Sequence, residues 1–125
     1  MGWRWIVGLL FIAHGCIHAS YLSRPPTPKP GAPQWPFHID HSPVLALLRF
    51  PRGQVRPAGT ALVMLVVAGF LATGTAFLAD SGWWPPMAVA AALASFVLLA
   101  LFYNPWLTLG LIIDTVIVVA VLAVE

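Results

Sequence analysis

The stretch Ala13-His14-Gly15-Cys16-Ile17-His18-Ala19 lies near the middle of the first long apolar run of the chain. Its two histidines are four residues apart, a spacing that places both side chains on one face of a helix. The apolar run around them is long enough for that helix to cross a membrane. Because an ionisable side chain is costly at membrane depth, His14 and His18 are candidate functional residues.

The composition of the whole chain is typical of a membrane protein. Of its 125 residues, 60% are hydrophobic and only 8% are charged, whereas a soluble domain carries roughly a quarter charged residues. No polar segment is long enough to build a separate water-soluble core, so we expect one membrane domain over residues 1–125. Cys16 is the one cysteine, which excludes an internal disulfide and a cysteine-rich metal motif. The sequence has no nucleotide-binding glycine loop, HExxH zinc motif, nucleophile elbow or basic–aromatic surface, so we expect no nucleic-acid partner.

Four apolar segments, each of roughly 18–23 residues, are long enough to cross a hydrocarbon core of ~30 Å. They cover residues 3–22, 57–79, 86–103 and 105–124. The predicted fold is therefore all-α: an integral membrane protein with an up-down bundle of four transmembrane helices. Aromatic side chains near the segment ends fit a belt at the membrane–water boundary: Trp3, Trp5, Tyr21, Trp83, Trp84, Tyr103 and Trp106.

The first segment also has features of a lipoprotein signal peptide, because Arg4 precedes an apolar core that ends in Ala13-His14-Gly15-Cys16. A histidine directly before Gly15 is unfavourable for such processing, so we expect residues 3–22 to remain as a helix. The second and third segments are rich in small residues, which allow helices to approach closely in lipid. These residues are Ala68, Gly69, Ala72, Gly74, Ala88, Ala90, Ala91, Ala92, Ala94 and Ser95.

Residues 23–56 form a long polar connection whose first part is rich in proline and should be extended. Trp35, Phe37 and Ile39 follow as apolar anchors, and Ser42-Pro43 predicts the start of a short helix over residues 43–49. We therefore expect a docked lid rather than a free linker.

The connection also carries most of the basic residues. Against Asp40 alone it has Arg24, Lys29, Arg49, Arg52 and Arg56. The positive-inside rule then predicts a multi-pass protein of the inner (plasma) membrane, with residues 23–56 in the cytoplasm and both termini outside. Arg4, at the other end of the first segment, favours the opposite orientation.

The polar residues of the spans fall into layers. With a rise of ~1.5 Å per residue, His14, Ser95 and Asp114 each lie roughly 12–13 Å from the helix end that adjoins residues 23–56. His18 and Thr108 fall in a second layer, roughly 5–7 Å closer to that end. Because Asp114 alone would be very costly in hydrocarbon, we expect it to pair with an imidazole.

Several interpretations of this polar layer stay open. In the first, His14, His18, Ser95 and Asp114 bind a small or lipid-like molecule of quinone or isoprenoid type, with Trp35 and Phe37 closing the entrance. In the second, the chain is a non-catalytic accessory or scaffold subunit whose polar layer only fixes helix packing. A cavity that reaches His14 favours the first interpretation, and a fully packed interior favours the second. A transporter or channel is a third, which would require oligomerisation.

Metal binding is a further possibility, because histidines four residues apart can chelate an ion. The candidates are His14 and His18, with His38 and His41 in the polar connection as a second group. Asp40 lies between the latter two; it could join His18, or it could cap the helix that follows Ser42. The last three segments contain no histidine, so we expect no haem held by two histidines of this chain. The sequence does not identify a cofactor, and the expected partners are membrane lipids, a small hydrophobic ligand, and a second copy or larger membrane complex.

Residues 3–15, Trp3-Arg4-Trp5-Ile6-Val7-Gly8-Leu9-Leu10-Phe11-Ile12-Ala13-His14-Gly15, resemble the first helix of the DoxX and DoxX-like membrane proteins. That helix typically has Arg, a few apolar residues, Gly-Leu-hydrophobic-Phe, a small residue or His, then Gly, two residues and Lys. The length and the four-helix topology are also similar. The resemblance implies a bacterial inner-membrane protein, in some cases a subunit or partner of quinone-linked or thiol-stress oxidoreductases. This chain differs in having His18 at the lysine position and no acidic residue in its second segment.

Overall fold

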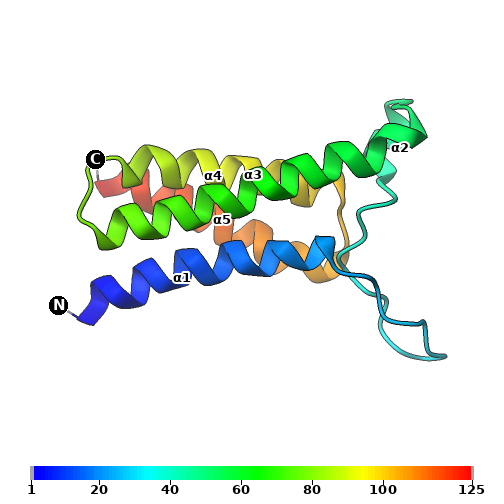
Figure 1. Cartoon of the computed structure of the whole chain (residues 1–125), viewed down its shortest axis with the longest axis horizontal. Helices are drawn as coiled ribbons and strands as arrows, with labels where there is room; N and C mark the ends of the chain where they lie inside the picture. The colour runs from blue at the N-terminus through cyan, green and yellow to red at the C-terminus, as the bar shows by residue number, and fades with distance from the viewer. Residues whose placement is uncertain (1, 125) are drawn as a thin grey trace.

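The computed structural model describes residues 2–124; Met1 and Glu125 lie outside the described residues. Four helices are long and apolar enough to cross a membrane, which confirms the predicted all-α membrane bundle. They run side by side, and both ends of the described chain lie at the same end of the bundle (Figure 1). The elements are α1 (Gly2–His18), η1 (Ala19–Leu22), α2 (Pro43–Leu47), α3 (Arg52–Leu78), α4 (Trp84–Leu101), η2 (Pro105–Leu107) and α5 (Thr108–Val124).

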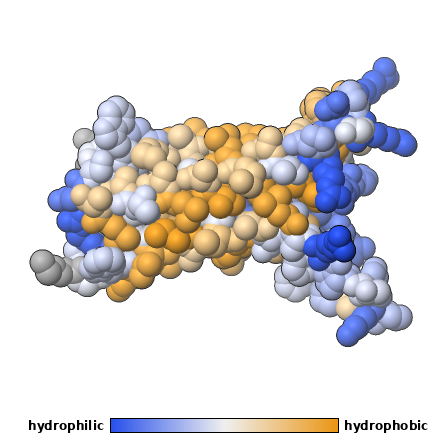
Figure 2. All heavy atoms as spheres, in the orientation of Figure 1, coloured by the Kyte–Doolittle hydropathy of each residue, from blue (hydrophilic) through white to orange (hydrophobic). Residues whose placement is uncertain are grey.

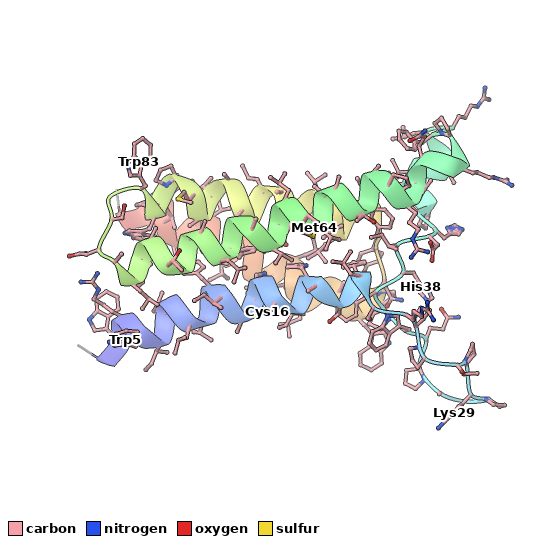
Figure 3. All side chains as sticks on the ribbon, in the orientation of Figure 1. Trp5, Cys16, Lys29, His38, Met64 and Trp83 are labelled. Carbon is pink, nitrogen blue, oxygen red and sulfur yellow. The ribbon has the colours of Figure 1, made fainter. Side chains whose placement is uncertain are left out.

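The surface has the pattern expected of a multi-pass membrane protein. Hydrophobic side chains cover the middle of the bundle and hydrophilic ones gather at its two ends (Figure 2). Figure 3 shows Trp5 and Trp83 at the end where the chain begins, Lys29 and His38 at the other end, and Cys16 between them. Trp3, Trp83 and other terminal tryptophans are exposed, as the aromatic belt predicts.

Tyr21 does not belong to this belt, because its side chain is only 1% exposed. Its ring packs at 5.1 Å from Phe37 and 6.2 Å from Phe102, measured between ring centroids. The chain after α1 folds back over this end of the bundle and covers Tyr21. Tyr21 therefore lies at a segment end in the sequence, but its tertiary contacts place it in the core.

The second span begins earlier than predicted. We expected it at residue 57, but α3 starts at Arg52, after the N-cap Pro51, and contains Pro57. The missing amide proton of Pro57 leaves one helix hydrogen bond unmade, to the carbonyl of Gly53. Because Gly53 is exposed, water can satisfy that carbonyl, so the helix tolerates the proline.

Two further helix boundaries differ from the prediction by two residues. Helix α2 ends at Leu47 rather than residue 49, because Arg49 adopts a left-handed backbone with φ of 55°. Helix α4 starts at Trp84, two residues before the predicted start, and the last span opens with the 3-10 turn η2. These differences leave the four-span topology unchanged.

The connection before α2 docks onto the bundle through Ile39 and Ser42, which are both buried. The hydroxyl of Ser42 accepts a hydrogen bond from the Leu45 amide at 3.0 Å and so caps α2, as predicted. The same hydroxyl donates to the carbonyl of Leu101 at the end of α4. Asp40 does not cap α2; it forms an exposed ion pair with Arg56 at 3.1 Å.

The helices pack in the order α1, α3, α4, α5. At the α1–α3 interface the backbones come so close that glycine is required. A Cβ atom on Gly15 would lie 2.7 Å from Cβ of Phe70, and one on Gly74 would lie 2.7 Å from the carbonyl oxygen of Gly8. Within the described chain, α1 and α5 have no comparable interface, so the bundle is open between its first and last helices.

Candidate functional site

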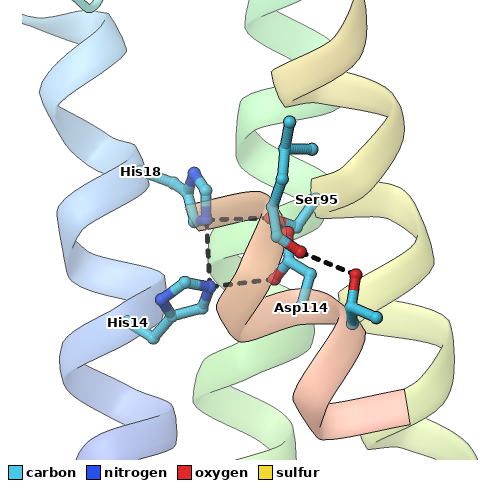
Figure 4. Close-up of polar contacts among 6 residues, drawn as sticks. His14, His18, Ser95 and Asp114 are labelled. Atoms are coloured by element: carbon cyan, nitrogen blue, oxygen red, sulfur yellow. Dashed lines mark hydrogen bonds and ion pairs between the residues drawn. The ribbon is translucent and has the colours of Figure 1, made fainter. Parts of the chain in front are cut away.

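The polar side chains of three spans meet in one cluster, which we call the polar cluster: His14, His18, Ser95 and Asp114 (Figure 4). Nε2 of His14 lies 3.0 Å from Oδ1 of Asp114. The hydroxyl of Ser95 lies 2.6 Å from Oδ2 of Asp114 and 2.9 Å from Nε2 of His18. The two histidine Nε2 atoms are 3.4 Å apart. The predicted layer of His14, Ser95 and Asp114 is thus present, and His18 joins it.

Each member of the polar cluster is placed by the helix that carries it. The spacing of four residues on α1 turns both imidazoles toward the same side. Ser95 lies on the small-residue face of α4 beside the buried Ala91 and Ala92, which keeps α4 close to its neighbours. Phe70 of α3 covers the imidazoles from behind, with its ring 4.7 Å from that of His14 and 6.1 Å from that of His18.

The polar cluster is almost closed to its surroundings. Ser95, Asp114 and His18 are 0%, 1% and 2% exposed, while the side chain of His14 is 10% exposed. Nδ1 of His18 is buried without a hydrogen-bond partner among the described residues. His14 is therefore the member through which the polar cluster contacts the exterior.

That contact opens into a groove between α1 and α5, which we call the α1–α5 groove. It has a volume of about 680 Å³ and contains His14 in its wall. Apart from His14 and the indoles of Trp3 and Trp84, every lining side chain is aliphatic or phenyl. Leu10 and Ile17 line it from α1, and Val116 and Ala120 from α5. The groove lies between α1 and α5, the two neighbouring helices that do not pack closely against each other.

No family model matches the chain, and neither does any curated protein or solved structure. The similarity of residues 3–15 to the first DoxX helix therefore stays a prediction.

The other predicted site residues lie elsewhere. Trp35 and Phe37 pack on each other at 5.5 Å, and Phe37 packs on Tyr21. Neither residue lines the α1–α5 groove, so they do not form the entrance that we expected over His14. Thr108 bonds to the Tyr103 hydroxyl and to the carbonyl of Pro105 rather than to His18.

The histidines of the connection form a separate group. His38 and His41 line a pocket of about 360 Å³ against Tyr103 and Asn104. They do not meet the histidines of α1, and Asp40 pairs with Arg56 instead of joining them. The sequence interpretation missed Phe70 and the apolar groove wall, since nothing distinguishes these positions from other apolar positions of the spans.

Proposed function

We propose that this membrane protein binds an apolar, lipid-like molecule of quinone or isoprenoid type in the α1–α5 groove. The observation that carries the proposal is the groove itself, with its volume of about 680 Å³, its apolar wall and His14 in that wall. Ligand sites typically measure about 300–1,000 Å³ and combine apolar walls with a few polar groups. Because the groove lies among membrane-spanning helices, its ligand enters from the bilayer.

His14 supplies the polar contact to this ligand. Its Nε2 faces Asp114, and its Nδ1 lies on the side of the ring away from Asp114 and Ser95 (Figure 4). Nδ1 has no hydrogen bond to any described residue, so it can accept a hydrogen bond from a ligand hydroxyl when Nε2 carries the ring proton, or donate one to a ligand carbonyl when Nδ1 carries it. Asp114 fixes the orientation of the ring, as carboxylates commonly do for functional histidines.

A non-catalytic scaffold subunit is the alternative, and the polar cluster supports it because its hydrogen bonds tie α1, α4 and α5 together. A scaffold whose polar layer only fixes packing does not require an open groove that reaches His14. The groove therefore favours ligand binding. The resemblance of residues 3–15 to DoxX-like proteins suggests a quinone as the ligand and a membrane oxidoreductase as a partner protein.

We place the protein in the plasma membrane with residues 23–56 in the cytoplasm. Five basic residues against one acidic residue support this orientation. On the opposite side, Arg4 forms a 2.8 Å ion pair with Asp80 and donates to the carbonyl of Phe77. Arg4 is outnumbered by the five basic residues among residues 23–56.

The proposal is tested by mass spectrometry of lipids extracted from the purified protein. We expect a defined apolar molecule above the bulk-lipid background. The double variant Val116→Trp/Ala120→Trp fills the groove and should lose that molecule. The matched control is Val119→Trp, since Val119 lies on α5, is 60% exposed and does not line the groove.

Two results would overturn ligand binding. The first is a wild-type protein that carries only bulk lipid. The second is a His14→Ala variant that folds normally and keeps the same bound molecule in the same amount.

A further inference from the structure

We propose that His14, His18 and Asp114, together with Ser95, bind a divalent first-row transition-metal ion inside the membrane. The proposal concerns the polar cluster, whereas the lipid-like ligand would occupy the α1–α5 groove. Only His14 belongs to both, and the metal proposal does not depend on the groove being occupied.

Two of the three ligand pairs, His14 with His18 and His14 with Asp114, have the spacing of a coordination shell. One atom each from His14, His18 and Asp114 can be chosen so that all lie within 4.8 Å of one another. The two Nε2 atoms are 3.4 Å apart, and Nε2 of His14 is 3.0 Å from Oδ1 of Asp114. Zinc bonds of about 2.0–2.1 Å in a tetrahedral site hold neighbouring ligand atoms about 3.3–3.4 Å apart. Small adjustments of the side chains therefore complete the site.

Hydrogen bonding alone accounts poorly for the contact between the histidines. Ser95 gives its single proton to Asp114, so its oxygen accepts a proton from Nε2 of His18. With Asp114 ionised, Nε2 of His14 also carries a proton, which it donates to the carboxylate. The two N–H groups then donate to separate acceptors, and their positive ends lie side by side with the nitrogens only 3.4 Å apart and no hydrogen bond between them.

A metal ion removes this conflict, because it accepts a lone pair from each Nε2 in place of the two protons. The burial of Asp114, Ser95 and His18 also favours an ion, since the ion places a positive charge beside the one acidic side chain that lies within the spans.

The donor set selects the class of metal. Two imidazoles and one carboxylate suit Zn²⁺, Fe²⁺ and related divalent ions rather than Ca²⁺ or Cu⁺. Cys16 lies on the exposed side of α1 and adds no thiolate. With three firm protein ligands, a fourth position stays available to the Ser95 hydroxyl or to water, which is typical of catalytic rather than structural zinc sites.

The test is a titration of the purified, chelator-treated protein with Co²⁺, whose visible absorption reports imidazole and carboxylate coordination. We expect saturation at one ion per chain and displacement by Zn²⁺. His18→Gln and Asp114→Asn should each weaken Co²⁺ binding about tenfold or more. The control His38→Gln/His41→Gln removes two histidines outside the polar cluster and should bind as the wild type does.

Further measurements make the result decisive. Circular dichroism and gel filtration identify any variant that does not fold. X-ray absorption of the Co²⁺-loaded wild type counts the imidazole ligands, and we expect two. The groove-filling variant Val116→Trp/Ala120→Trp should keep Co²⁺ binding even where it loses the lipid-like molecule. Absent Co²⁺ absorption in the wild type, or loss of it in His38→Gln/His41→Gln alone, would overturn the metal site.

Discussion

Nε2 of His14 and Oδ1 of Asp114 lie 3.0 Å apart although 100 positions separate them in the chain. Among the described residues this is the one hydrogen bond that directly joins α1 to α5. The two helices otherwise leave the α1–α5 groove between them. The first and last helices of the bundle are thus held to each other by polar contacts rather than by apolar packing.

Asp114→Ala should therefore destabilise the bundle more than an ordinary truncation of a small side chain does. It removes the acceptor of both His14 and Ser95 and leaves buried donors without partners. Unsatisfied buried groups cost about 1–3 kcal/mol. The midpoint of unfolding in detergent should therefore be lower for Asp114→Ala than for the wild type. The midpoint of Asp114→Asn, which keeps one acceptor oxygen, should be lowered less.

The control for this prediction is Thr115→Ala on the same helix. Thr115 is exposed and bonds only to the carbonyl of Leu111 within α5. Equal unfolding midpoints for Asp114→Ala and Thr115→Ala would show that the polar cluster does not hold α1 and α5 together.

The spans and the layer of His14, Ser95 and Asp114 could be predicted from the sequence, because helix rise is fixed and long apolar runs are distinctive. Thr108 shares the predicted second layer with His18 but does not bond to it, since depth alone does not say which way a side chain points. It lies at the start of α5, where its hydroxyl finds Tyr103 and the Pro105 carbonyl nearby.

The α1–α5 groove could not be predicted. Val116 lines it and Val119 does not, yet both are exposed valines on α5. Lipid and an apolar groove select the same residue types, so hydropathy does not separate them. The gap between α1 and α5 follows from the angles at which the other helices pack, which no local pattern encodes.

Gly74→Ala should weaken the α1–α3 interface. The new Cβ would lie 2.7 Å from the carbonyl oxygen of Gly8 and 2.6 Å from Cγ1 of Ile12, so the backbones must separate. Overpacking of this kind costs about 1–3 kcal/mol. The unfolding midpoint should drop, whereas Gly82→Ala, whose Cβ meets no atom within 4 Å, should stay near the wild type. A Gly74→Ala protein as stable as Gly82→Ala would contradict the close approach of α1 and α3.

Ser42→Ala should release the connection before α3 from the end of the bundle. The substitution removes the cap of α2 and the hydrogen bond to the Leu101 carbonyl. Loss of such a cap costs about 0.5–2 kcal/mol. Amide exchange over α2 should accelerate severalfold while exchange in α1 stays unchanged. Ser23→Ala is the matched control, because the Ser23 hydroxyl is exposed and bonds only to the nearby Ser20 carbonyl.

Cysteine labelling on intact cells should locate residues 23–56 in the cytoplasm. In a Cys16→Ala background, Lys29→Cys places a thiol in the connection and Gly82→Cys places one in the turn between α3 and α4, at the opposite end of the bundle. We expect a membrane-impermeant maleimide to label Gly82→Cys directly and Lys29→Cys only after permeabilisation. The reason is the positive-inside rule: five Lys and Arg residues lie in this connection, against Arg4 alone at the other end. Labelling of Lys29→Cys in intact cells would show that the connection lies outside and would overturn this orientation.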